Sequence, residues 1–175
     1  MKKKIIKNKG MLFWITGLPG SGKTAVAKSI RKKIISKYGP TILFSGDDMR
    51  KIFKLNKYSI NERLKNGIKF TNFCKFVTNQ NINIIFATVG LFNKLRIYNK
   101  KNIKNYIEIY IKADLNKIIK TGKKKLYKRH KSNLYGKDIK AELPTKPDIV
   151  IVNNFSKNIT KLADELLVKI YKKIQ

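Results

Sequence analysis

One glycine-rich segment constrains the fold of this chain more than any other feature. It reads Gly17-Leu18-Pro19-Gly20-Ser21-Gly22-Lys23-Thr24 and has the spacing G-x-x-x-x-G-K-[ST]. An apolar run, Leu12–Thr16, precedes it, and an amphipathic stretch, Lys23–Ser36, follows it. This context predicts a buried strand, a tight turn and a helix. In such a turn the backbone N–H groups point inward and bind phosphate oxygens.

The residues of this loop suit a nucleoside triphosphate. Glycines allow the tight turn, and the start of the following helix adds the positive end of its dipole. Lys23 supplies a compact positive charge for the β- and γ-phosphates, and the Thr24 hydroxyl is a ligand for Mg²⁺. We therefore predict that residues 17–24 bind ATP and Mg²⁺.

Apolar runs alternate with longer amphipathic stretches along the whole chain. The expected strands are Leu12–Thr16, Thr41–Phe44, Ile82–Thr88, Tyr106–Ala113 and Asp148–Val152, and the expected helices are Lys23–Ser36, Ile60–Asn79 and Ile159–Ile174. This order predicts an α/β P-loop NTPase fold, a parallel five-stranded sheet sandwiched by helices. A length of 175 residues predicts one domain, residues 1–175. The basic stretch at about 117–137 is expected to be a mobile, charged lid rather than core.

The charge of the chain is extreme, with 41 lysines and arginines against 10 acidic residues and a net charge of +31. Such an excess points to anionic partners, nucleic acid among them. Only five of these residues are arginines, and no cluster mixes arginines with aromatic residues as nucleic-acid readers do. We interpret most of the charge as a solvated lysine surface and predict a small nucleotide substrate and no nucleic-acid partner.

Cysteine content and hydropathy indicate the compartment. The single cysteine, Cys74, excludes an internal disulfide and suits a reducing cytoplasm. No apolar run approaches the ~18 residues that a membrane span needs. We therefore expect a cytoplasmic protein without a membrane partner.

An acidic pair, Asp47-Asp48, follows the expected strand Thr41–Phe44. Ligands of parallel α/β sheets bind at the carboxyl ends of the strands, where this pair would lie. A carboxylate there can accept the proton of an attacking hydroxyl and order the water shell of Mg²⁺. Asp47 is the predicted base and metal-site residue, although one of the two can instead cap the next helix. The run Ile82–Val89 lacks the terminal carboxylate of motor-type P-loop ATPases.

Several short segments share a pattern with one known family. Trp14–Thr24 follows W-x-T-G-L-x-G-x-G-K-[ST], while Ser45–Arg50 and Tyr58–Asn66 approach D-G-D-N-x-R and F-S-x-x-D-R-x-x-N. Leu126-Tyr127-Lys128 and Lys146-Pro147-Asp148 add weaker matches. Over roughly residues 12–172 the chain thus resembles the adenylylsulfate (APS) kinase family of small P-loop kinases.

The resemblance implies roles for individual residues. It makes Asp47 the base for a ribose 3′-hydroxyl, and Lys23 and the lid residue Lys128 the cations that neutralise charge on the transferred phosphoryl group. Tyr58 would replace a phenylalanine that stacks on the acceptor base. The residues implied to bind the acceptor's 5′-phosphoanhydride group are Arg50, Arg63 and Asn66. A homodimer is also implied.

The acceptor-side motifs depart from the family pattern. Val89-Gly90-Leu91-Phe92 stands where the family has I-S-P-F, and Asn133-Leu134-Tyr135-Gly136 stands where it has G-F-T-G. The lid motif R-D-P-K is replaced by Thr121–Lys124. Because these positions lie near the acceptor in the family, Val89, Gly90, Leu134 and Tyr135 are taken as acceptor-site residues.

The departures favour an acceptor other than adenylylsulfate within the same family. The chain resembles members of the family that act on cytidine diphosphoramidate in capsule phosphoramidate biosynthesis, and this resemblance implies that compound, which keeps the ribose and the charged 5′ tail, as the expected acceptor. Adenylylsulfate is the first alternative. A nucleic-acid-binding ATPase, suggested by the charge, and a nucleotide-binding module without catalysis are the others.

Overall fold

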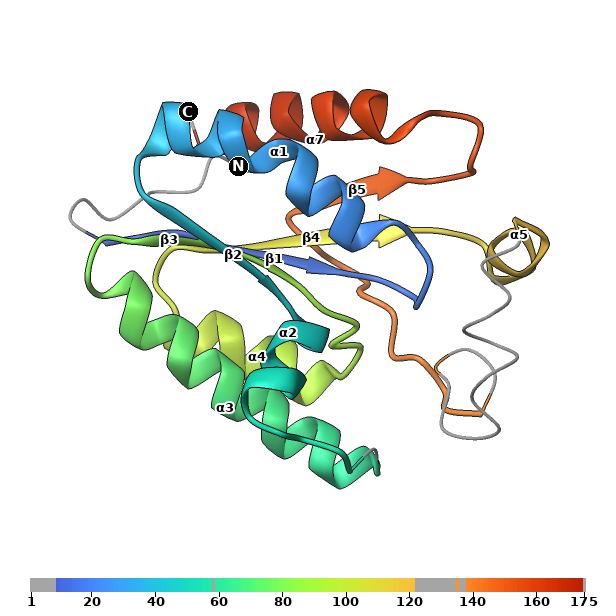
Figure 1. Cartoon of the computed structure of the whole chain (residues 1–175), viewed down its shortest axis with the longest axis horizontal. Helices are drawn as coiled ribbons and strands as arrows, with labels where there is room; N and C mark the ends of the chain where they lie inside the picture. Colours follow the sequence, from blue (N-terminus) through green and yellow to red (C-terminus); the bar gives the residue numbers. More distant parts are fainter. Residues whose placement is uncertain (1–8, 58, 122–134, 136–137, 175) are drawn as a thin grey trace.

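A computed structural model describes residues 9–57, 59–121, 135 and 138–174 (Figure 1). Its centre is one five-stranded parallel sheet with the strand order β2-β3-β1-β4-β5. The strands are β1 (Leu12–Thr16), β2 (Thr41–Ser45), β3 (Asn83–Ala87), β4 (Tyr106–Lys112) and β5 (Ile149–Val152). The predicted parallel five-stranded sheet is therefore confirmed.

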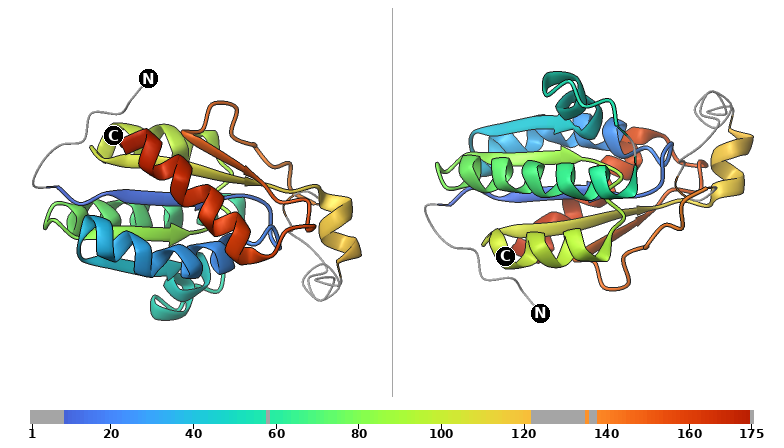
Figure 2. Two further views of the ribbon diagram at one scale, coloured as in Figure 1. Left: turned by 90° about the horizontal axis from the view of Figure 1, so that it is seen from above. Right: turned by 90° about the horizontal axis from the view of Figure 1, so that it is seen from below.

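Helices cover both faces of the sheet. Helices α1 (Lys23–Tyr38) and α7 (Ile159–Ile174) pack on one face, as the left-hand view of Figure 2 shows. Helices α3 (Ile60–Thr78) and α4 (Asn93–Asn102) cover the other face, with the short α2 (Gly46–Ile52) beside them. A further short helix, α5 (Leu115–Lys120), lies beyond the end of β4.

The strands in the middle of the sheet are buried on both faces. All five residues of β1 and all five of β3 are buried, as expected for parallel strands between two helical layers. The core on the α1 and α7 side is mostly aliphatic, whereas the core under α3 is aromatic and centres on Trp14, Phe86 and Phe70. The carboxyl ends of all five strands meet at one edge, which is where the glycine-rich loop emerges.

Among the described residues, three helices were not predicted from periodicity, namely α2, α4 and α5. Helix α4 is rich in lysine and asparagine, and Leu95 is its one buried apolar residue, so it carries little hydrophobic pattern. Helix α2 is only seven residues long and is set by a capping box rather than by an apolar stripe.

Two described residues of the stretch at about 117–137, Ile118 and Tyr135, belong to the core, where no core role was expected, whereas the lid role itself stays a prediction. Ile118 is fully buried and Tyr135 is 2% exposed, and both belong to a cluster with Leu18, Leu91 and Ile139. The burial of these two residues could not be predicted from the sequence, because the apolar residues of this stretch are widely spaced among lysines. Within the described part of the chain, no helix has both the length and the apolar character to cross a membrane.

Candidate functional site

The glycine-rich loop joins β1 to α1, as predicted. Gly17 and Gly22 have φ angles of 150° and 94°. A Cβ on Gly17 would lie 2.5 Å from the Ile111 carbonyl oxygen on the neighbouring strand, so only glycine fits there. Gly22, in the left-handed conformation, precedes the first residue of α1. The loop therefore ends at a helix N-terminus, which suits a bound phosphate group.

Lys23 begins α1 and folds back over the loop. Its side chain is buried, and Nζ donates a hydrogen bond to the Leu18 carbonyl oxygen at 2.7 Å. Burial lowers the pKa of Lys23 to about 7, and the negative charge of Asp47 opposes this shift. Nζ also lies 3.5 Å from the Ser21 hydroxyl, so two groups of the loop itself hold the ammonium group in place.

The two acidic residues after β2 have different surroundings. Asp48 forms a capping box with Ser45: its Oδ2 accepts from the Ser45 backbone N–H at 2.7 Å, and its own N–H donates to the Ser45 hydroxyl at 3.2 Å. These bonds with Ser45 lower the pKa of Asp48. Asp47 instead has an 85% exposed side chain and pairs with Arg50 one turn later. Of the pair, Asp48 has the capping role and Asp47 is accessible to a ligand.

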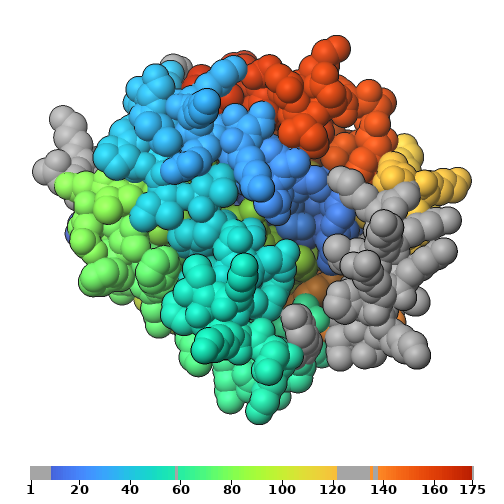
Figure 3. Space-filling view, viewed as in Figure 1, coloured from blue at the N-terminus to red at the C-terminus, as the bar shows by residue number. Residues whose placement is uncertain are grey.

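An open pocket of about 480 Å³ lies along α2 and the turn that follows it. It is lined by Asp47, Arg50, Lys51, Lys54, Leu55 and Asn56. Figure 3 shows this part of the surface in teal, over α2 and the start of α3. Three cations and one carboxylate give the lining a net positive charge, which suits an anionic ligand. Four lining residues were not among the predicted site residues, because α2 and the turn after it carry no hydrophobic period: Lys51, Lys54, Leu55 and Asn56.

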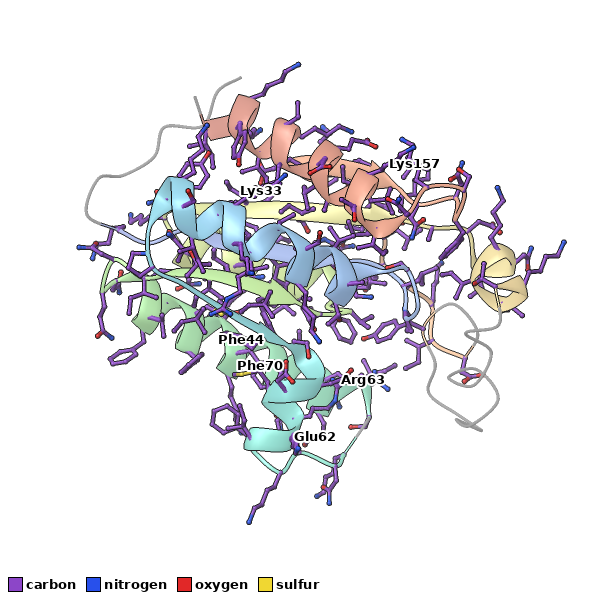
Figure 4. The ribbon with its side chains drawn as sticks, turned by 45° about the horizontal axis from the view of Figure 1, so that its top comes forward. Lys33, Phe44, Glu62, Arg63, Phe70 and Lys157 are labelled. Carbon is purple, nitrogen blue, oxygen red and sulfur yellow. The ribbon has the colours of Figure 1, made fainter. Side chains whose placement is uncertain are left out.

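Arg63 and Tyr135, predicted on the acceptor side, are neighbours in space. Arg63 lies in the first turn of α3 (Figure 4), and its Cζ atom is 5.2 Å from the centre of the Tyr135 ring. The Tyr135 ring also meets Phe92 edge-on, with centroids 5.6 Å apart. Asn66, one turn beyond Arg63, is buried in α3. The aromatic ring at position 135 thus packs beside a predicted substrate residue.

The residues that directly follow β3 lie between the glycine-rich loop and the start of α2, because β3 lies between β1 and β2 in the sheet. Val89 accepts a hydrogen bond from the Thr16 hydroxyl through its carbonyl oxygen. Gly90 has a φ of 45°, and a Cβ there would lie 2.9 Å from the Trp14 ring. The Thr88 hydroxyl would lie 2.9 Å from a Cβ on Gly46, which places it next to the start of α2. Thr88 was not among the predicted site residues, because a lone threonine at a strand end carries no signal.

Asn153, which directly follows β5, contacts the glycine-rich loop through its side chain. Its side-chain amide donates to the Ser21 carbonyl oxygen at 3.0 Å, and its Oδ1 accepts from the Phe155 N–H at 3.0 Å. The residue is 3% exposed. Sequence reasoning missed it because it lies 132 positions from the loop.

Three predicted site residues, Tyr58, Lys128 and Leu134, lie outside the described residues. Within the described ranges, no group of three or more histidine, cysteine, aspartate or glutamate side chains gathers to hold a metal ion. The residues predicted for Mg²⁺, Thr24 and Asp47, are both exposed at the strand-end edge. They supply oxygen ligands of the type that Mg²⁺ takes together with substrate phosphates and water.

Comparison with known proteins places this geometry in a family. Residues 9–152 match the adenylylsulphate kinase family. A cytidine diphosphoramidate kinase of Campylobacter jejuni is 34% identical over 168 residues, covering 94% of this chain and 98% of the relative. An adenylyl-sulfate kinase of Clostridium kluyveri is 26% identical, covering 97% and 90% respectively.

Solved structures agree on the fold. The APS kinase of Mycobacterium tuberculosis, in complex with AMPPNP and APS, superposes with a TM-score of 0.83 at 20% identity, over 93% of this chain and 98% of that one. At this level of identity the match shows that the two chains share a fold. The chain therefore belongs to the adenylylsulfate kinase family of ATP-dependent nucleotide kinases.

Proposed function

We propose that this protein transfers the γ-phosphoryl group of ATP to the ribose 3′-hydroxyl of a nucleoside with a charged 5′-diphosphate-like tail. The preferred acceptor is cytidine diphosphoramidate. The observation that carries this proposal is that the phosphate loop with Lys23 and the start of α2 with Asp47 follow the carboxyl ends of β1 and β2, at the same edge of the parallel sheet. A phosphate donor and a sugar hydroxyl can meet between these two side chains.

Asp47 would act as the base at the acceptor. Its carboxylate is exposed, so it can accept the proton that the 3′-hydroxyl loses as its oxygen attacks the γ-phosphorus. Arg50, which pairs with Asp47, holds that carboxylate toward the pocket along α2. Lys23 would stabilise the negative charge on the transferred group.

The 5′ tail of the acceptor would lie against the cations of the site. Arg50 lines the pocket along α2, and Arg63 stands at the start of α3. A guanidinium group binds two phosphate oxygens with parallel hydrogen bonds, which suits a diphosphate-like tail. The Tyr135 ring, whose centre lies 5.2 Å from Arg63 Cζ, would help to orient that guanidinium.

Thr24 and Asp47 would hold Mg²⁺, the former through its hydroxyl and the latter through water. When bound, the ion neutralises charge on the β- and γ-phosphates. The preference for cytidine diphosphoramidate over adenylylsulfate is supported by 34% identity to the Campylobacter jejuni enzyme against 26% to the Clostridium kluyveri enzyme.

A coupled ADP-release assay with an acceptor panel tests the proposal. The panel holds cytidine diphosphoramidate, adenylylsulfate, cytidine diphosphate and single-stranded DNA, each with Mg²⁺ and with excess chelator. We expect the first compound to give the highest kcat/KM and the chelator to abolish turnover. Stimulation by DNA alone would favour the nucleic-acid ATPase instead. ADP release that no acceptor increases would refute the proposal.

The role of Asp47 is tested by Asp47→Asn, with Asp164→Asn as the matched control. Asp164 lies on α7 and pairs with Lys33 on α1, on the opposite face of the sheet. Loss of a general base lowers kcat by ~10²–10⁴-fold. We expect that loss for Asp47→Asn and none for Asp164→Asn. Equal kcat values in the two variants would exclude Asp47 as the base.

A further inference from the structure

A buried arginine on α4, Arg96, stands outside the proposed site yet connects to it. Its side chain is 8% exposed, and its Nε lies 3.4 Å from Glu108 Oε1 on β4. Its Nη1 donates to the Glu142 carbonyl oxygen at 2.6 Å, and its Nη2 donates to the Leu143 carbonyl oxygen at 3.4 Å and to the Asn93 side chain. One guanidinium therefore joins a helix, a strand and the segment 139–143.

The bonds from Arg96 fix how segment 139–143 lies along the molecule. Apolar contacts alone allow a loop to slide, because burial has no direction. A planar guanidinium that meets two successive carbonyl oxygens specifies one register. The ion pair with Glu108, itself 3% exposed, holds the guanidinium in turn.

Glu142 ties the same segment to the loop after β3. Its backbone N–H donates to the Leu91 carbonyl oxygen at 3.3 Å. Its carboxylate accepts from the Asn93 backbone N–H at the start of α4, where an anion also meets the positive end of the helix dipole. Segment 139–143 is thus fastened to α4 at two points, Arg96 and Asn93.

The segment leads directly to the acceptor side of the site. Ile139 forms an isolated bridge with Tyr135. Both residues are buried with Leu91 in the cluster that also contains Leu18 of the phosphate loop. The Tyr135 ring then faces the guanidinium of Arg63 at 5.2 Å. A continuous chain of contacts runs from Arg96 to a proposed acceptor residue.

We propose that Arg96 is a positioning residue for the acceptor: it fixes segment 139–143, and through Tyr135 it sets the guanidinium of Arg63. It touches neither the phosphate loop nor Asp47 through any described contact. Replacing Arg96 should therefore weaken binding of the acceptor and leave binding of ATP nearly unchanged. This inference rests on the proposed function, because it takes Arg63 as an acceptor contact.

The kinetic test compares Arg96→Met and Arg96→Lys with Arg31→Met, an exposed arginine on α1. Misplacing a substrate-binding group by ~1 Å can cost on the order of 100-fold in activity. We expect Arg96→Met to raise the acceptor KM on the order of tenfold, with the ATP KM within about twofold of wild type. Arg96→Lys keeps a positive charge beside Glu108, so its acceptor KM should lie between those of wild type and Arg96→Met. The acceptor KM of Arg31→Met should equal that of wild type.

A double variant separates positioning from general destabilisation. If Arg96 acts through Tyr135, adding Arg96→Met to Tyr135→Leu should change the acceptor KM little beyond the single change. The inference would be overturned if the two substitutions raised the acceptor KM independently, so that their fold-changes multiplied in the double variant. It would also be overturned if folded Arg96→Met raised the KM for ATP as much as that for the acceptor, or left the acceptor KM unchanged. Should Arg96→Met not fold, the same criteria apply to Arg96→Lys.

Amide hydrogen exchange tests whether Arg96 anchors segment 139–143, and it does so without an activity assay. In Arg96→Met, peptides over 138–143 should lose protection, while peptides over β1 should not. Unchanged protection over 138–143 would overturn the inference. If wild type shows no acceptor-dependent turnover, the proposed function fails while exchange still decides whether Arg96 anchors the segment.

Discussion

We expect ATP binding to depend on pH, because the phosphate loop carries a buried lysine, Lys23. Lys23 has a pKa of about 7 because burial disfavours its charge. Bound phosphates need the charged form and return its pKa toward the ordinary value of 10.5 or above. Binding ATP above pH 7 must therefore take up a proton, and the affinity falls as the pH rises.

The size of this effect follows from the pKa of the free protein. With a pKa of about 7, half of the free molecules carry a charged Lys23 at pH 7, whereas about 1% do at pH 9. If only the charged form binds, the apparent Kd rises about 50-fold between these pH values. Phosphate groups with a second pKa of ~6 are already ionised over this range and contribute little.

Isothermal titration with a non-hydrolysable ATP analogue measures both the apparent Kd and the number of protons taken up on binding. At pH 8, titrations in buffers of different ionisation enthalpy should show uptake of close to one proton. Lys23→Arg should bind with no pH dependence, since arginine stays charged. Lys32→Met, an exposed lysine on α1, should keep the full dependence. A flat Kd between pH 7 and 9 with no proton uptake would refute the reasoning.

Three further outcomes are expected. Asn153→Ala, which frees the Ser21 carbonyl, should raise the ATP KM on the order of tenfold, while exposed Asn154→Ala should not, by steady-state kinetics. Gly90→Ala should lower the free energy of unfolding by ~1–3 kcal/mol in urea, because a Cβ would lie 2.9 Å from Trp14 at a φ of 45°; an unchanged midpoint would contradict this. Cys74 should resist a thiol reagent until the protein unfolds, because burial raises its pKa; labelling of native protein at the unfolded rate would contradict this.

The strands and the long helices were predictable because their patterns are local. The buried run of β3 and the apolar stripe of α7 are each visible within a few residues. Helices α2 and α4 were missed for a physical reason. Their stability comes from a capping box and from buried polar contacts such as that of Arg96, neither of which has a hydrophobic period.

The glycine-rich loop, read alone, determined a strand, a turn and a helix, because its spacing fits that arrangement, and it predicted a phosphate ligand. Which of the two acidic residues caps α2 was decided only in three dimensions, where Ser45 takes Asp48 as its capping partner and the Asp47 side chain stays 85% exposed. The same holds for Asn153 against Ser21 and Tyr135 against Arg63. These pairs are far apart in sequence, and a single sequence carries no signal for a contact that only packing creates.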